Sequence, residues 1–195
     1  MTAIQKRRSI RKYKPEPVSK ELLEEIMRAG MLAPSSKNRQ PWRFIVTTGA
    51  AKADALEAME RGLKREKQQP LLPQSACHLA GAWHTLDIMK QAPAVIWIVN
   101  PLGLSIHETI GSEERIYEIC NAQSIGAALE NMTLAAQELG LGSLWICDIY
   151  FAFEEMQQWL HEKGELVAAL AIGYGDEAPD PRPRKRIEHV IEWRN

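Results

Sequence analysis

Hydrophobic residues recur along the chain with two spacings, one typical of helices and one typical of strands. Residues 19–34 show the helical spacing, with Ser19 suited to cap the first turn and Pro34 ending the helix. Its predicted core-facing side consists of Leu22, Leu23, Ile26, Met27 and Gly30. Further helices are predicted over 51–67, 123–140 and 153–162. The first of these three is charged and expected to be exposed, and the second is apolar on nearly every side, which places it within the core.

Four β-rich stretches, residues 43–49, 92–100, 143–149 and 166–174, predict strands. The stretch 92–100 is continuously apolar, as in a strand buried on both sides. Helices that alternate with strands favour a parallel, doubly wound sheet, while an α+β arrangement stays open.

Residues 68–87 have no settled hydrophobic period and are interrupted by Pro70, Pro73 and Gly81. Long irregular segments in compact domains are commonly binding loops, lids or mobile connections. We therefore expect this stretch to be irregular.

Composition narrows the class of protein. With 195 residues, 45% of them hydrophobic, the chain predicts a single domain over 1–195. Its 24 basic and 25 acidic residues give a net charge of -1, which disfavours a nucleic-acid partner. Three cysteines without CxxC spacing favour reduced thiols and a cytoplasmic location. The apolar runs are too short to cross a membrane, so no membrane partner is expected.

Several catalytic signatures are missing from the sequence. The histidines lack metal-ligand spacing, so no metal site is predicted. The glycines of GLGS (140–143) follow a predicted helix and precede a strand, the reverse of a Rossmann nucleotide fingerprint. Hydrolysis by a G-x-S-x-G serine is also unsupported. The sequence therefore supports none of these three kinds of site.

The segment RRSIRKY (7–13) gathers three arginines and two hydroxyl groups. A solvated basic segment, a nucleic-acid arm and a phosphate grip all fit it. Arg7 and Arg11 are four residues apart, so in a helix both guanidinium groups would point the same way. Guanidinium forks match phosphate oxygens, and Ser9 adds a hydroxyl donor.

Two other segments have suitable chemistry for the same ligand. APSSKNRQPW (33–42) holds polar side chains between two prolines, which stiffen the loop and lower the entropy cost of presenting donors and acceptors together. RPRKR (182–186), near the C-terminus, is a second source of positive charge.

With these segments in view, the chain resembles the nitroreductase family of FMN-dependent oxidoreductases. The matching motifs occur in the family's order: RRSIRKY, APSSKNRQPWRF, SIGAALENMTLAA, LGLGSLWI and GYGD followed by RPRKRIEHV. Only residues of about 60–115 match poorly, and in this family that variable region shapes the substrate pocket. The resemblance implies an α+β fold with a central, mainly antiparallel sheet flanked by helices, and an interlocked homodimer.

The resemblance also implies a cofactor-binding site shared by the two subunits. One subunit would hold the FMN phosphate and ribityl chain with Arg7, Arg8, Ser9 and Arg11, helped by Arg182 and Arg184. The other subunit would contribute Pro34, Ser35, Ser36, Asn38 and Gln40. Trp145, Ile146 and Cys147 would line the flavin ring, with the backbone N–H of Cys147 near N5. Some relatives have glycines at positions 147 and 148, whereas this chain has Cys147 and Asp148.

The implied activity is transfer of hydride from NADPH or NADH, through FMN, to an electron-poor acceptor such as a nitroaromatic compound or a quinone, by a ping-pong mechanism. The cofactor would carry the chemistry, and the protein would supply position and electrostatics, so no side chain is predicted to act as a catalytic acid, base or nucleophile. An alternative is an FMN-binding carrier or sensor that nicotinamides do not reduce. A nucleic-acid-binding protein is a third alternative, disfavoured by the balanced charge.

Overall fold

The computed structural model describes residues 2–161 and 163–194. The helices are α1 (Thr2–Lys6), α2 (Lys20–Met31), α3 (Gly49–Gln68), α4 (Leu79–Gln91), α5 (Ser112–Glu138) and α6 (Phe153–Leu160). The strands are β1 (Arg43–Thr48), β2 (Ala94–Asn100), β3 (Gly142–Ile146) and β4 (Glu165–Gly173). Short 3-10 helices cover Ser36–Asn38, Pro73–His78, Asp148–Ala152 and Ile187–His189.

The strands form one sheet in the order β1-β2-β4-β3, and every neighbouring pair is antiparallel. The predicted α+β fold with an antiparallel sheet is therefore confirmed, and the parallel, doubly wound interpretation is wrong. The reason lies in the connection from β1 to β2, which contains two helices, α3 and α4. A single crossover helix returns the chain to the end where the first strand began, whereas a pair of helices brings it back to where that strand ended.

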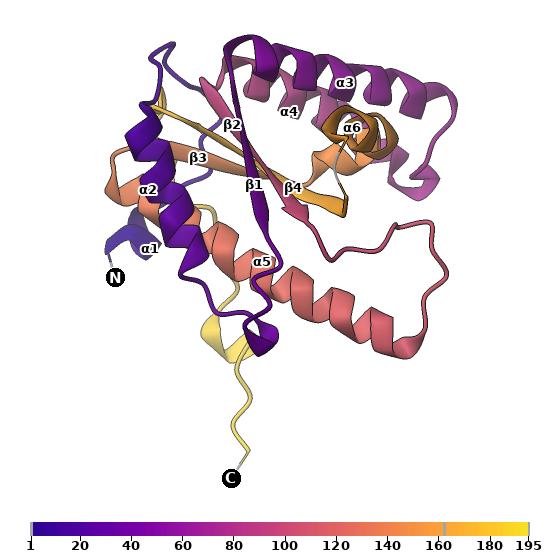
Figure 1. Ribbon diagram of the computed structural model, residues 1–195. Helices are drawn as coiled ribbons and strands as arrows, with labels where there is room; N and C mark the ends of the chain where they lie inside the picture. Colours follow the sequence, from indigo (N-terminus) through magenta and orange to yellow (C-terminus); the bar gives the residue numbers. More distant parts are fainter. Residues whose placement is uncertain (1, 162, 195) are drawn as a thin grey trace.

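Helices cover both faces of the sheet (Figure 1). Helices α3, α4 and α6 pack on one face, and α2 and α5 pack on the other. Strand β2 is buried along its whole length, and its side chains alternate between the two cores. Its continuous apolar run thus indicates that both faces of the strand are buried. It does not indicate whether the neighbouring strands are parallel or antiparallel to it.

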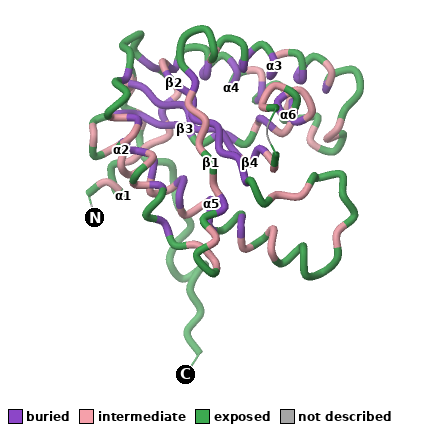
Figure 2. Tube along the Cα trace, in the orientation of Figure 1, coloured by how far each residue is buried: buried purple, intermediate pink, exposed green. Residues whose placement is uncertain are grey.

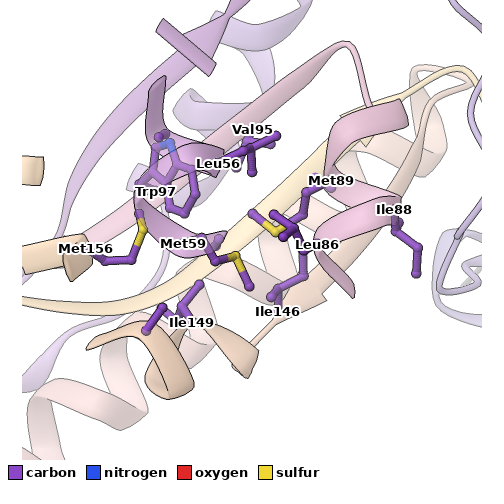
Figure 3. Close-up of a cluster of buried hydrophobic side chains, with 14 of the residues drawn as sticks. Leu56, Met59, Leu86, Ile88, Met89, Val95, Trp97, Ile146, Ile149 and Met156 are labelled. Carbon is purple, nitrogen blue, oxygen red and sulfur yellow. The ribbon is translucent and has the colours of Figure 1, made fainter. Parts of the chain in front are cut away.

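The core under α3, α4 and α6 is built around Trp97 (Figure 3). This residue is fully buried, as expected, and its indole N–H donates to Thr47 Oγ1 at 2.9 Å. Its ring centroid lies 5.4 Å from that of Trp159 on α6. Pairing the buried N–H with a hydroxyl avoids the penalty of an unsatisfied donor, so the indole can fill this core.

The predicted helix over 19–34 is present as α2. The Ser19 side chain accepts a hydrogen bond from the Leu22 N–H at 3.3 Å, and Leu23, Ile26 and Gly30 are buried. A Cβ on Gly30 would lie 2.8 Å from Met132 Cγ, so the glycine permits close packing of α2 on α5.

The structure corrects five other sequence predictions. Residues 68–87, expected to be irregular, include a 3-10 helix and most of α4. Helix α3 is not an exposed helix, because Leu56, Met59 and Leu63 are buried. The long helix α5 begins at Ser112, well before 123, and the strand predicted over 143–149 ends at Ile146. Helix α6 ends at Leu160, and position 162 in the predicted range lies outside the described residues.

The irregular expectation for 68–87 failed because the prolines stand only at its start. Within α4, Ala82, Leu86 and Met89 are spaced by four and three residues and face the core. The helical period was present in the sequence but is hidden when the prolines and the helix are taken as one segment.

The C-terminal end of the chain extends away from the body of the molecule (Figures 1 and 2). Residues Ile187, Val190 and Trp193 are exposed there, Trp193 by 85%. None of the helices in the described part of the chain combines the length and the apolar character needed to span a lipid bilayer.

Candidate functional site

The N-terminal basic segment is held between the ends of two strands. Ile10 N–H donates to Ser143 O at 3.0 Å beside β3, and Lys14 N–H donates to Tyr174 O at 2.9 Å just after β4. Ile10 and Tyr13 are buried in the core, so the segment is anchored by packing as well as by backbone bonds. A Cβ on Gly142 would lie 2.8 Å from Ile10 Cγ1, which shows how closely the segment approaches β3.

Anchoring brings the arginines of both chain ends to one cavity, named here the arginine cavity. Its volume is about 480 Å³. Five arginines and one aspartate line it together with apolar and neutral residues: Ile4, Gln5, Arg7, Arg8, Ser9, Arg11, Pro179, Asp180, Pro181, Arg182 and Arg184. Such a surplus of guanidinium groups suits a phosphate or another dianion.

The arginines converge for a different reason from the one the spacing suggested. Helix α1 ends at Lys6, and Ser9 forms a parallel bridge with Ser143, so residues 7–11 are not helical. The one-turn argument for Arg7 and Arg11 is therefore wrong, although both residues line the cavity. An extended segment paired beside the sheet replaces the predicted helical turn.

Arg7 is only partly satisfied by the protein. Its Nε is buried without a hydrogen-bond partner, and the Glu130 carboxylate lies 3.6 Å from it. By contrast, Arg8 and Arg11 donate to nearby backbone carbonyls, Arg8 to Gln5 O at 2.8 Å and Arg11 to Ser9 O at 3.1 Å. A buried N–H donor without a partner is costly in the protein alone, and an anionic ligand could accept its hydrogen bond.

The serine loop, residues 34–40, lies between α2 and β1 and contacts α5. Ser36 N–H donates to Ser124 Oγ at 3.3 Å, and Gln40 N–H donates to Ser35 Oγ at 3.0 Å. Lys37, Asn38 and Gln40 all have positive φ, between 49° and 54°. Three non-glycine residues in this strained region within one loop are typical of functional sites.

None of the serine loop's residues lines the arginine cavity. The structure thus brings Arg7, Arg8, Ser9, Arg11, Arg182 and Arg184 together in one place and Pro34, Ser35, Ser36, Asn38 and Gln40 in another. That a second copy of the chain joins the two groups into one FMN site stays a prediction.

The end of β3 presents the third predicted group. Trp145 is 40% exposed in a strand whose other residues are buried, and its ring lies near Gly126 of α5. Ile146 points into the core, so only its backbone is free to line a ligand. Cys147 follows at the surface; burial of its thiol and the neighbouring Asp148 raise its pKa, which disfavours a nucleophilic thiolate.

Asp148 is held by a residue that the sequence did not single out. Thr85 Oγ1 on α4 donates a hydrogen bond of 2.5 Å to the Asp148 carboxylate. This bond fixes the position of a negative charge directly after Cys147. It also ties α4 to the end of β3.

A second cavity, named here the α5 cleft, lies between the serine loop, the segment after β2 and the first half of α5. Its volume is about 470 Å³, and its lining residues are Arg39, Leu102, Leu104, Glu114, Tyr117, Glu118 and Asn121. The Arg39 guanidinium lies 4.3 Å from the centre of the Tyr117 ring, a cation–π contact.

Glu165, at the start of β4, lies close to this region. Burial raises its pKa to about 7, and the carboxylates of Glu118 and Glu108 act in the same direction. Its Oε1 is buried without a hydrogen-bond partner. The group therefore changes its charge near neutral pH.

No cluster of three His, Cys, Asp or Glu side chains with the geometry of a metal site occurs among residues 2–161 and 163–194. The site chemistry is thus that of arginines, hydroxyls, backbone amides and one aromatic ring.

Comparison with known proteins identifies the family. Residues 4–174 match the family model described as "Nitroreductase family". The chain belongs to the nitroreductase family. Among curated relatives of this nitroreductase-family chain, a protein of Thermus thermophilus named "NADH dehydrogenase" is 29% identical over 206 residues, covering 99% of this chain and 95% of the relative.

Solved structures agree with this assignment. A protein of Desulfovibrio desulfuricans described as a nitroreductase and crystallised with FMN has a TM-score of 0.71 at 26% identity, covering 100% of this chain and 96% of that one. A BluB-like flavoprotein of Clostridium difficile has a TM-score of 0.74 at 27% identity, covering 100% and 98%.

Sequence reasoning missed three polar residues near the candidate sites: Thr85, Asn121 and Glu165. Asn121 had a signal, because it precedes Ile125 by four residues and Ala128 by seven, which puts an amide on the buried side of α5. The late predicted start of this helix concealed that pattern. For Thr85 and Glu165 no local signal exists, since their partners come from distant segments.

Proposed function

We propose that this protein is an FMN-dependent oxidoreductase that takes hydride from NADPH or NADH and passes it to an electron-poor small molecule, such as a nitroaromatic compound or a quinone. The observation that carries the proposal is the arginine cavity, lined by guanidinium groups from both chain ends in a member of the nitroreductase family. The FMN-bound structure of the D. desulfuricans relative supports the choice of cofactor.

The arginine cavity fits the phosphate of FMN. Arg7, Arg8 and Arg11 would bind it from the N-terminal segment, while Arg182 and Arg184 would bind it from the other side. Ser9 would add a hydroxyl donor. Because guanidinium groups offer paired N–H donors, they suit a phosphate in both charge and shape.

The serine loop would complete the site from a second subunit. Large apolar side chains are exposed near it: Met31 ends α2, Leu32 follows it, and Ile116 and Ile119 lie on α5. Exposed apolar groups of this kind favour association. The exposed apolar tail, with Trp193, supports the same proposal of a homodimer.

When bound, FMN supplies the ring that accepts and donates hydride. The chain's own contribution would be position and charge. Trp145 and the Cys147 backbone N–H would lie along the ring, and Asp148, held by Thr85, would place a carboxylate nearby. That carboxylate would disfavour an anionic reduced flavin.

A ping-pong order follows if the nicotinamide and the acceptor use the same space in turn. Residues of about 60–115 would shape this space, as in the family. The three cysteines are free in the structure, which supports a reducing, cytoplasmic location.

Purification provides the first test. A yellow protein whose flavin bleaches under anaerobic NADPH or NADH, and regains colour with a quinone or nitroaromatic compound, is the expected result. A colourless protein that ignores added FMN would contradict the proposal. Retained FMN that neither nicotinamide reduces would favour the carrier or sensor instead.

Sedimentation equilibrium tests the subunit arrangement. We expect a dimer of the 22.0 kDa chain. Removing the residues after 186, which include Trp193, should weaken the dimer. A monomer that binds FMN at full affinity would refute the shared site.

A further inference from the structure

The α5 cleft has features of a small-molecule site separate from the arginine cavity. Its volume of about 470 Å³ falls within the range of small-ligand pockets. It shares no lining residue with the arginine cavity. Leu102, Leu104 and the Tyr117 ring supply apolar walls, which suit the body of an organic molecule.

One buried group in the cleft lacks its partner. Asn121 lines the cleft and is only 2% exposed, and its buried Oδ1 has no hydrogen-bond partner. Buried side-chain acceptors in folded proteins are almost always paired. An unpaired amide oxygen on a residue that lines a cavity therefore points to a donor supplied by a ligand.

The other polar groups of the cleft are also mainly acceptors. Glu114 and Glu118 contribute carboxylates. Tyr117 already donates its hydroxyl proton to Glu113 at 2.7 Å, which leaves only its acceptor capacity. Arg39 is the one cationic lining group, and its guanidinium lies against the Tyr117 ring.

We propose that the α5 cleft binds a planar organic molecule that carries N–H donors and is neutral or cationic, such as an aromatic amide or amidine. The N–H group pairs with Asn121 Oδ1, the ring lies between Leu102, Leu104 and Tyr117, and a positive charge, when present, is balanced by Glu114 and Glu118. An aromatic carboxylate is rejected, because it brings acceptors to an acceptor-rich wall.

Three probes of equal ring size test the chemistry: benzamidine, benzamide and benzoate. Titrated by calorimetry into the purified protein, with whatever flavin it retains, benzamidine and benzamide should bind at least tenfold more tightly than benzoate. Benzoate that binds as tightly as benzamide, or no binding by any probe, overturns the proposal. The latter result is expected if a second copy of the chain fills the cleft.

Variants locate the binding. Asn121→Leu, close in size but without the amide, should weaken benzamide at least tenfold, whereas Gln123→Leu, an exposed amide on the same helix, should change it less than twofold. Asn121→Asp keeps an acceptor and adds charge, so it should retain or strengthen benzamidine binding. Unchanged benzamide affinity in Asn121→Leu would refute the site.

Flavin content and melting temperature, measured on the same samples, separate this inference from the proposed function. A colourless protein that binds benzamide through Asn121 would contradict only the proposal that the protein uses FMN. A yellow protein that NADPH reduces, but whose probe binding is unchanged by substitution of Asn121, would contradict only the proposed site in the α5 cleft.

Discussion

The arginine cavity and the α5 cleft have nearly equal volumes, about 480 and 470 Å³, but opposite chemistry. Five arginines and one aspartate line the first, whereas one arginine and two glutamates are the charged residues of the second. The first is built where the two chain ends meet, and the second on the side of one long helix. A chain with a net charge of only -1 thus holds its charges apart in space.

This separation explains why the net charge argues against nucleic acid as a partner but does not predict whether a small anion binds. A balanced chain has no long-range field for a polyanion such as nucleic acid. A single phosphate, however, responds to charges within about one Debye length, roughly 8–10 Å. Local arrangement therefore decides whether a small anion is bound, and composition does not report it.

Removal of two arginines should have the largest effect on this contrast. Arg7→Ala with Arg11→Ala removes two charge-assisted contacts of roughly 1.5–3 kcal/mol each, so FMN affinity should fall roughly 10²- to 10⁴-fold. Benzamide binding in the cleft should not change. Flavin fluorescence titration measures the first effect and calorimetry the second. Arg28→Ala, an exposed arginine of α2 paired with Glu24, is the matched control. Wild-type FMN affinity in the double variant would show that the site assignment is wrong.

A methyl group at Gly142 tests whether docking of the N-terminal segment creates the arginine cavity. Gly142→Ala would press on Ile10 at 2.8 Å, which should cost about 2 kcal/mol of stability and weaken FMN binding. Gly81→Ala, within α4 and with no atom within 4 Å of the added Cβ, should instead stabilise by about 0.5–1 kcal/mol. Denaturant unfolding compares the two. Equal effects of both substitutions would contradict the close approach.

Ionic strength should distinguish the two cavities with no mutation. Raising salt from 50 to 500 mM should weaken FMN binding roughly tenfold, because screening acts on the phosphate and its arginines. Benzamide is uncharged, so its affinity for the cleft should change less than twofold. Titrations at four salt concentrations measure both slopes. If the affinities of FMN and benzamide depended equally on salt, the proposed electrostatic difference between the two cavities would be wrong.

The smallest expected effect is a dependence of stability on pH that comes from Glu165, which lies close to the α5 cleft. Since its pKa is raised to about 7 in the folded state, the proton is held more tightly there than in the unfolded chain, whose value is near 4.5. Stability is unaffected below about pH 4.5, falls as the pH rises, and has lost the full amount above about pH 7.

The side chain is partly exposed, so solvent screening limits the loss to about 1 kcal/mol, or about 2–4 °C in melting temperature. Glu165→Gln should flatten the melting temperature between pH 5 and 8, measured by thermal unfolding. Glu108→Gln, an exposed neighbour, should keep most of the wild-type slope. A variant at 165 with the wild-type pH profile would contradict the raised pKa.

Much of the fold followed from local pattern. Helix α2 has its predicted cap at Ser19, and three of its five predicted core-facing residues are buried, because capping and helical period act within a few residues. The direction of the strands did not follow. The direction of β2 relative to β1 depended on α4. The apolar period of this helix, at Ala82, Leu86 and Met89, follows two prolines, and the whole stretch was therefore predicted to be irregular.

The candidate sites divide in the same way. The arginines of both ends were recognised as one group through motifs, yet the reason for their convergence was wrong, because Ser9 pairs beside β3 instead of lying in a helix. The α5 cleft was missed entirely. Its defining residue, Asn121, becomes informative only when the lack of a partner for its Oδ1 is visible.

By itself, the sequence determined the family, the helices with clear periods and the residue types gathered for a phosphate. These depend on the order and spacing of neighbouring residues. Only the tertiary structure decided the antiparallel order β1-β2-β4-β3, the meeting of the two chain ends around one cavity and the unpaired amide of Asn121. Each of these is a relation between segments far apart in the chain, and their distances and pairings are set by packing, which local sequence does not encode.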